Sequence, residues 1–156
     1  MADIMPGQSA LTPLGLDAKP APEDAPVRMV EYAHSGKILL RGDPGNDNFT
    51  TAVRGVLGMA PPPVPLSSAI VKGWVLLWLG PDEWLIACPA GEEKALFAEL
   101  GAALEPVHAA LVDLTDAQTI IRISGPRARN LIAKGCTLDL HPRSFGSGQV
   151  TRITLA

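Results

Sequence analysis

Residues 74–88 read WVLLWLGPDEWLIAC, and this segment contains the clearest structural pattern of the chain. Two runs rich in aromatic and aliphatic residues, 74–79 and 84–88, flank the tetrapeptide Gly-Pro-Asp-Glu. Because proline fixes φ near the value that a tight turn needs, the pattern predicts a β-hairpin. The three tryptophans alternate with aliphatic residues at strand spacing. We therefore expect them in the core or on an interface, rather than in a platform for base stacking.

A helix is predicted on each side of this hairpin. The first is capped by Asn48 and ends at Gly58, and the second begins at Glu92 and Glu93 and ends before Pro106. In both segments apolar residues recur at helical spacing and therefore share one face. These residues are Phe49, Val53, Val56 and Leu57 in the first helix and Leu96, Leu100 and Leu104 in the second.

The order of the elements predicts an α+β fold. Strands expected at 37–41 and 111–115 enclose the two helices and the hairpin, and together they read β-α-β-β-α-β. This is the order of a ferredoxin-like unit, which predicts an antiparallel sheet with helices on one face. A further strand at 27–32 is expected to form a hairpin with 37–41 through a turn at 33–36.

The same order of elements begins a second time in the last 40 residues. A strand is expected at 119–124, then a helix with Pro126 at its first position and Gly135 just past its end, then a strand at 149–155. The sequence stops before a second helix and a closing strand. We therefore expect residues 27–156 to form a single α+β domain whose second unit is incomplete and lacks C-terminal elements.

Prolines mark two irregular segments. Five of them fall within residues 1–26, among alanine, glycine and aspartate and without apolar periodicity, so we expect a flexible Pro/Ala-rich tail there. The cluster at 61–65 reads PPPVP, which predicts a stiff extended connector because proline has no N–H to donate. A proline-rich ligand for another domain is the alternative interpretation of this cluster.

Composition and cysteine content limit the class of protein. With 156 residues, a net charge of −3 and 47% hydrophobic residues, the chain can bury a core without metal or disulfide support. Cys88 and Cys136 lie far apart, which argues against zinc, redox and haem sites and favours a reducing cytoplasm. The first residues lack the pattern of a signal peptide, and the most apolar stretch, 73–80, is too short to cross a bilayer. We therefore expect a cytoplasmic protein with no membrane association.

Charge is distributed unevenly along the chain. Residues 1–116 carry a net charge of −8 and residues 117–156 a net charge of +5, with Asp139 as the one acid of the second set. Such a basic region could bind an acidic protein or an anionic small molecule, or it could be a solvated face. We expect no nucleic-acid binding, because the whole chain is acidic and no Lys/Arg run is interleaved with aromatic residues.

The sequence contains no motif of a common catalytic site. No P-loop, dinucleotide-binding glycine motif, nucleophile elbow or zinc-protease helix occurs, and the three histidines stand apart. Cys136 follows a predicted helix end, which disfavours a thiolate, so a small buried hydrophobe is favoured over a reactive thiol. Asp113 either closes a turn with a threonine or offers a carboxylate to a substrate proton. We expect no catalytic residue and no metal site on this chain.

Four segments carry a resemblance to a known family. They are LGPDEWLI at 79–86, VDLTD at 112–116, ISGPRAR at 123–129 and AKGCTLDLHPRSF at 133–145. Together they resemble the γ subunits of heterotetrameric sarcosine oxidase, and the combination of the first and last segments is specific. That family is similar to the folate-binding fold of the aminomethyltransferase T-protein. The resemblance thus implies a folate-binding-domain-like fold.

The resemblance implies a role in a larger enzyme. Such a complex oxidatively demethylates sarcosine to glycine, passes electrons through FAD and covalent FMN to oxygen, and uses tetrahydrofolate to capture the one-carbon unit. The larger α and β flavoprotein subunits would hold the flavins, NAD and folate, and a small δ subunit would complete the heterotetramer. This chain would be a non-catalytic γ subunit that supports assembly. The alternative is a folate-binding protein that acts alone.

A docking subunit needs contact residues, and the sequence offers two sets. The first is the tryptophan-rich hairpin, from which Trp84 is a partner-interface candidate. The second is the HPRSF segment, in which His141, Pro142, Arg143 and Phe145 supply one aromatic anchor and one arginine. The alternative interpretation is that these residues cap the preceding helix and fill the core.

Overall fold

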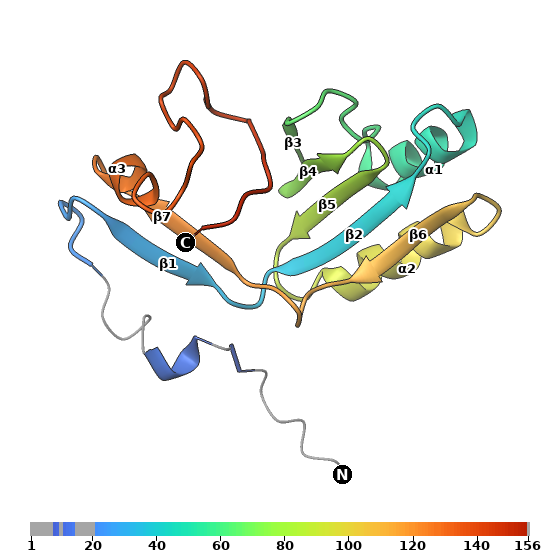
Figure 1. Ribbon diagram of the computed structural model, residues 1–156. Coiled ribbons are helices and arrows are strands. Elements are labelled where there is room, and N and C mark those ends of the chain that lie inside the picture. The colour runs from blue at the N-terminus through green and yellow to red at the C-terminus, as the bar shows by residue number, and fades with distance from the viewer. Residues whose placement is uncertain (1–7, 10, 15–20, 156) are drawn as a thin grey trace, which may run out of the picture.

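The computed structural model describes residues 8–9, 11–14 and 21–155 (Figure 1). Within these residues it has seven strands in two antiparallel sheets, three α-helices and a short 3-10 helix, the α+β class that the sequence predicts. In chain order the elements are the 3-10 helix Thr12–Leu14, β1 (Arg28–Tyr32), β2 (Gly36–Gly42), α1 (Asp47–Leu57), β3 (Ser68–Val71), β4 (Trp74–Gly80), β5 (Glu83–Cys88), α2 (Glu93–Leu104), β6 (Ala109–Asp113), β7 (Ile120–Ser124) and α3 (Ala128–Ile132).

The larger sheet has the strand order β3-β4-β5-β2-β6, and all neighbouring strands are antiparallel. Without the edge strand β3, this is the order that a ferredoxin-like unit forms from β2, α1, β4, β5, α2 and β6. The helices α1 and α2 lie on the same face of the sheet and pack against each other (Figure 1). The predicted ferredoxin-like unit is therefore confirmed, and β3 is an additional strand that the sequence pattern did not indicate.

The smaller sheet consists of β1 and β7, with a register that runs from Arg28 opposite Ser124 to Tyr32 opposite Ile120. The predicted hairpin between 27–32 and 37–41 is therefore wrong. The strand β2 lies between β5 and β6 and bonds to both, so neither of its edges is left for β1. The turn after β1 instead leads the chain from the smaller sheet into the centre of the larger one.

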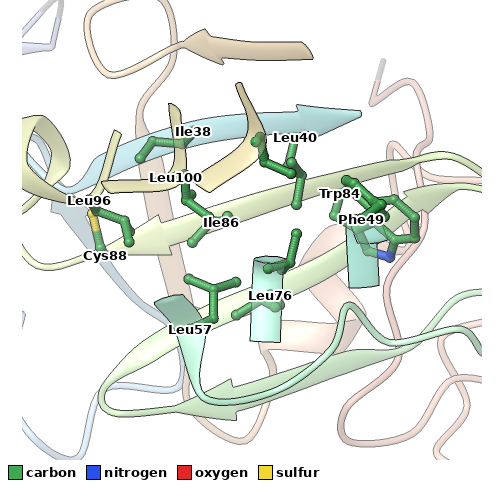
Figure 2. Packing of buried hydrophobic residues seen from close by; sticks show 12 residues of the cluster. Ile38, Leu40, Phe49, Leu57, Leu76, Trp84, Ile86, Cys88, Leu96 and Leu100 are labelled. Carbon is green, nitrogen blue, oxygen red and sulfur yellow. The ribbon is translucent and has the colours of Figure 1, made fainter. Parts of the chain in front are cut away.

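The hydrophobic core lies between the larger sheet and its two helices (Figure 2). Trp84 is fully buried in it, with its ring centroid 5.9 Å from that of Phe49. Its Nε1 donates a 3.0 Å hydrogen bond to the carbonyl of Pro62, and Pro61 and Pro62 are themselves buried. The predicted proline connector is thus held against the core by the central tryptophan. Other fully buried side chains are Ile38, Leu40, Val53, Leu57, Leu76, Ile86 and Leu100.

The ends of the first two helices follow the predicted pattern with one shift. The cap of α1 is Asn46 rather than Asn48. Asn46 still has an extended backbone, with φ −88° and ψ 113°, and its side chain accepts the N–H of Asn48 at 2.9 Å. Gly58 ends α1 as predicted, at φ 84°, and donates to the carbonyl of Arg54. The predicted apolar face of α2 is also confirmed, since its three leucines are buried.

The helix α3 begins and ends at other residues than the sequence predicts. Its caps are Arg127 and Ala133, so Pro126 lies before the helix and Gly135 lies two residues past its C-cap. The first turn needs a residue with a non-helical backbone to enter the helix, and Arg127 takes that position with φ −107° and ψ 10°. The predicted positions of Pro126 and Gly135 are therefore wrong by one or two residues.

The strand predicted at 149–155 is not formed within the described chain. Gln149 makes one isolated bridge to Ser67, and the N–H of Val150 donates to the carbonyl of Leu66 at 2.7 Å. The start of this segment, which is red in Figure 1, therefore contacts residues 66 and 67 just before β3, and no ladder of hydrogen bonds forms. β-branched residues are not sufficient for a strand, because a strand also needs a neighbour along its length.

The tail predicted at residues 1–26 lies partly outside the described residues. In the described part, residues 12–14 form the 3-10 helix, and the hydroxyl of Ser9 donates to the carboxylate of Glu31 in β1. This contact connects the tail to the smaller sheet, and the predicted flexibility stays a prediction.

The burial of Cys88 predicts unequal reactivity of the two cysteines. Desolvation, followed by the nearby carboxylates of Glu93, Glu92 and Asp113, raises the pKa of Cys88 from 9.0 to about 11. The thiolate fraction of Cys88 at pH 8 is thus expected to fall about 100-fold. In the folded chain, we expect a disulfide reagent at pH 8 to modify the half-buried Cys136 and to leave Cys88 unmodified until urea is added.

The same pKa predicts how stability changes with pH. Because the thiol ionises more easily in the unfolded chain, its contribution to stability is complete below about pH 9 and is lost as the pH rises toward about 11. Urea unfolding at pH 8, 9.5 and 11 measures this loss, and Cys88→Ala serves as the control in which the cysteine-dependent part is absent. A Cys88 that reacts in the folded chain as fast as Cys136 would contradict both expectations.

Candidate functional site

The HPRSF residues lie in a loop at 139–146 that follows α3, named here the 139–146 loop. Its backbone is folded on the carbonyl of His141, which accepts the N–H groups of Ser144 at 2.8 Å and Phe145 at 2.9 Å. The Nδ1 atom of the His141 ring accepts the N–H of Arg143 at 3.2 Å. In this arrangement a neutral His141 carries its hydrogen on Nε2. The loop thus has a defined shape without belonging to a helix or strand.

Asp139 holds the start of this loop. Its Oδ1 accepts the N–H of His141 at 2.9 Å, and its Oδ2 accepts the hydroxyl of Ser144 at 2.6 Å. These donors stabilise the carboxylate and lower the pKa of Asp139, the Ser144 hydroxyl contributing most, then the His141 N–H. The one acid of the basic region is therefore occupied by its own loop.

Arg129 connects the 139–146 loop to α3. Its Nη1 donates to the carbonyl of Leu140 at 2.5 Å and to the carbonyl of Phe145 at 2.9 Å. These carbonyls lie near the two ends of the loop, so one guanidinium fixes both ends against the helix. Sequence reasoning gave Arg129 no role of its own, because the acceptors are backbone atoms 11 and 16 residues away. Its position in the ISGPRAR segment was the one available signal.

A cavity of about 440 Å³ lies between β7, α3 and the 139–146 loop. Because Gly125 begins the connection from β7 to α3, the helix turns back and leaves space between the two elements. The cavity is lined mainly by apolar side chains, and the loop closes one side of it. Its side-chain lining includes Ile123, Ala128, Arg129, Ile132, Leu140 and Phe145.

The structure brings four of the five predicted contact residues together. His141, Pro142 and Arg143 are exposed, whereas Phe145 is half-buried and lines the cavity. This arrangement, an anchored aromatic ring beside exposed polar groups, suits a contact surface. It also agrees in part with the alternative interpretation, because the half-buried Phe145 helps to fill the space between α3 and the loop.

Trp84 does not belong to this surface. Its side chain is 0% exposed and forms the centre of the core, far from solvent. A strand residue that faces the helices of its own domain has no surface to offer a partner. The structure therefore corrects Trp84 from an interface candidate to a core residue, which was the other interpretation of the tryptophan set.

The remaining candidate residues have structural surroundings. The Oδ1 atom of Asp113 accepts the N–H of Thr115 at 2.9 Å, and the side chain and backbone of Thr115 lower the pKa of this carboxyl. Asp113 thus closes the turn after β6, as one of its two interpretations predicts. Cys136 is half-buried just after α3.

Among the residues that the structure describes, no three histidine, cysteine, aspartate or glutamate side chains are grouped so that they could hold a metal ion. None of the described helices has the length and apolar character needed to span a membrane.

Comparison with known proteins adds to this geometry. Residues 41–156 match the sequence profile of the "Sarcosine oxidase, gamma subunit family". One curated relative, the sarcosine oxidase subunit gamma of Corynebacterium sp. (strain P-1), is 37% identical over 130 residues. The match covers 83% of this chain and 63% of the relative, so the chain spans slightly less than two thirds of the relative's length.

Two solved structures resemble the fold. A chain of the heterotetrameric sarcosine oxidase from Corynebacterium sp. U-96 in complex with pyrrole 2-carboxylate matches with a TM-score of 0.79 and 32% identity, over 93% of this chain and 73% of that one. The glycine cleavage system aminomethyltransferase T from Bartonella henselae matches with a TM-score of 0.58 and 17% identity, over 70% of this chain and 32% of that one. The second likeness concerns the fold alone, and it agrees with the folate-binding-domain-like fold expected from the sequence.

Proposed function

This chain belongs to the sarcosine oxidase gamma subunit family, and on this basis we propose that it is a non-catalytic subunit that supports assembly of a heterotetrameric sarcosine oxidase. The observation that carries the proposal is the similarity of 93% of the chain to part of a heterotetrameric enzyme, at 32% identity. In this role the 139–146 loop makes contacts with a partner subunit. Its exposed arginine and its anchored aromatic ring supply polar and apolar parts of such a contact.

The proposal assigns the chemistry to other subunits. The larger α and β flavoprotein subunits would carry FAD, covalent FMN, NAD and tetrahydrofolate and would demethylate sarcosine to glycine, and a small δ subunit would complete the complex. The two free cysteines, Cys88 and Cys136, suit the cytoplasmic location that forms part of this proposal. Tagged chain purified from its native host tests the assignment. A yellow eluate with flavin absorption and a pair of large flavoproteins is expected, and a colourless solitary chain would contradict it.

A second candidate function is folate binding by the chain alone. The observation that favours it is the fold-level likeness to an aminomethyltransferase, together with a basic region beside a cavity. A fold hosts many functions, so this support is weaker than that for the subunit role. Titration of the isolated chain with tetrahydrofolate distinguishes the two, because saturable binding in the micromolar range is expected only of the stand-alone folate protein.

Changes in the 139–146 loop are expected to weaken docking without unfolding the chain. The double variant Arg143→Glu/Phe145→Ala reverses an exposed charge and removes the half-buried ring. We expect at least a tenfold loss of affinity for the flavoprotein subunits, since truncation of an anchoring residue costs about 2 kcal/mol or more. Co-purification from a host that expresses all subunits measures the loss.

A matched control separates docking from folding. Arg54 is exposed on α1 and Phe97 is half-buried on α2, so Arg54→Glu/Phe97→Ala makes the same chemical changes elsewhere. The control is expected to co-purify as the unchanged chain does, and circular dichroism should show thermal unfolding for both variants. If the loop variant loses its fold and its binding together, the loop is a structural element rather than a contact surface.

A further inference from the structure

The cavity beside the 139–146 loop has mainly apolar walls and one cation. Arg129 is the one charged residue in its described lining, and its Nη1 already donates to two backbone carbonyls. The apolar walls are formed chiefly by Ile123, Ile132, Leu140 and Phe145. Transfer of a charged group into such surroundings costs free energy unless the group is paired. The cavity therefore suits an apolar side chain.

Three further cations lie around this cavity. Arg127, Lys134 and Arg143 are exposed, and each is within two residues of a residue that lines the cavity. Within the part of the chain that the structure describes, their side chains make no ion pair and no hydrogen bond. The other three arginines of residues 117–155 all donate hydrogen bonds to other groups.

None of the described acids forms an ion pair with these three cations. Asp139 uses both carboxylate oxygens to accept hydrogen bonds from its own loop. Glu31, on the strand paired with β7, accepts the hydroxyls of Ser9 and Thr119. This end of the molecule therefore presents three unpaired cations and an apolar cavity on a chain whose other part is acidic.

From these observations, and resting on the proposed subunit function, we infer that the segment of the partner subunit bound here is acidic and inserts one apolar side chain into the cavity. Carboxylates on the partner pair with Arg127, Lys134 and Arg143, and the inserted side chain packs between α3 and Phe145. Such a contact has the anatomy of a protein interface, in which a desolvated apolar anchor is surrounded by a charged rim.

A protein segment fits this site better than a small anion. A small anion that entered the cavity would meet one cation, Arg129, whose Nη1 already donates to two carbonyls of the loop. The unpaired cations come from the start of α3, the residues after it and the loop, so an extended segment with several carboxylates can reach more than one of them. Leu131, which is 43% exposed on α3, adds apolar surface outside the cavity.

A charge-reversal pair tests the rim. The variant Arg127→Glu/Arg143→Glu is compared with Arg54→Glu/Lys94→Glu, which makes the same change of charge at exposed positions of α1 and α2. Affinity for the flavin-containing subunits is measured at 50 mM and 500 mM salt. We expect the rim variant to bind at least tenfold more weakly at low salt, with a smaller difference at high salt because ions screen the charges. The control variant should stay within about twofold of the unchanged chain.

A second variant fills the cavity without a change of charge. Ala128 lines the cavity, so Ala128→Leu occupies the space that the inserted side chain needs, and exposed Ala102 on α2 provides the control Ala102→Leu. At least tenfold weaker binding is expected for the first and no change for the second. Thermal unfolding by circular dichroism confirms that both variants fold.

The outcomes distinguish this inference from the proposed function. If the unchanged chain binds the flavin-containing subunits and both test variants bind as their controls do, the acidic and apolar contact is wrong and the subunit role stands. If the unchanged chain does not bind these subunits at all, the proposed function fails. If tetrahydrofolate binds the chain and Ala128→Leu abolishes that binding, the cavity holds a small anion and the inference is overturned.

Discussion

Replacement of Trp84 by alanine is expected to lower the free energy of unfolding by about 3–5 kcal/mol, the cost typical of a buried tryptophan or phenylalanine truncated to alanine. The side chain is fully buried against Phe49, so its removal leaves a cavity in the middle of the sheet and helix contact. The variant also removes the donor for the carbonyl of Pro62 and so releases the proline connector. Urea unfolding followed by circular dichroism measures the change.

Two further variants separate the causes of this loss. Trp84→Phe keeps an aromatic ring but lacks the indole N–H. Its loss of unfolding free energy therefore comes from the unpaired carbonyl of Pro62 and the smaller ring, and it should be well below the loss caused by alanine. Ile70 is 76% exposed on β3, and Ile70→Ala is expected to change stability by about 0.5 kcal/mol or less. Equal losses for Trp84→Ala and Ile70→Ala would show that Trp84 does not anchor the core.

Replacement of Gly125 by alanine is expected to destabilise the chain by about 2–4 kcal/mol, for two reasons that add. The residue has φ +104°, a conformation that costs any residue with a Cβ about 1–3 kcal/mol. A Cβ there would also lie 2.7 Å from the carbonyl oxygen of Pro26, and this oxygen accepts the N–H of Arg127 at the start of α3. The backbone must therefore move at the place where the candidate site begins.

Gly148→Ala is the matched control for this prediction. Gly148 has φ +80°, and no atom lies within 4 Å of the position that its Cβ would take, so only the conformational cost of about 1–2 kcal/mol is expected. The difference in unfolding free energy between the two variants, measured by urea unfolding, gives the cost of the clash with Pro26. Gly125→Ala should also speed amide exchange in β7 and α3. Equal stabilities of the two variants would mean that the backbone at Pro26 can move away from the new Cβ without loss of stability.

Elements whose signals are local could be predicted from the sequence. The hairpin of β4 and β5 depends on a turn between two adjacent apolar runs, and the two main helices depend on spacing within a dozen residues. The ferredoxin-like order followed because sequential elements in this unit are neighbours in space. The resemblance carried by the motifs at 79–86 and 133–145 gave the family.

Elements whose partners are distant could not be predicted in the same way. The strand at Arg28–Tyr32 has the composition of a hairpin strand, yet its partner β7 lies roughly 90 residues away. The segment 149–155 is rich in β-branched residues, yet it makes one isolated bridge, at Gln149. For the first strand the decisive fact was that both edges of β2 are taken by β5 and β6, and for the second segment it was that pairing occurs at a single position. No local pattern contains either fact.

Some residues of the candidate site could also be predicted from the sequence, and others could not. The HPRSF residues could be selected because their types are unusual together, and four of the five candidates do lie in one loop or beside its cavity. The burial of Trp84 could not be separated from exposure by strand alternation alone, since both faces of its strand are apolar. The role of Arg129 depends on backbone carbonyls, which every residue has, so its sequence context did not mark it.

The pairing of β1 with β7 has a consequence for the time course of folding. The ferredoxin-like unit lies between these strands in the chain, so β1 is the first of the seven described strands to be made and its neighbour β7 is the seventh. At a synthesis rate of about 5–20 residues per second, β1 waits about 5–20 s with Val30 and Tyr32 unpaired. Once the larger sheet forms, it brings the two strands near each other and shortens the loop that their pairing must close. We therefore expect the smaller sheet to form after the larger one.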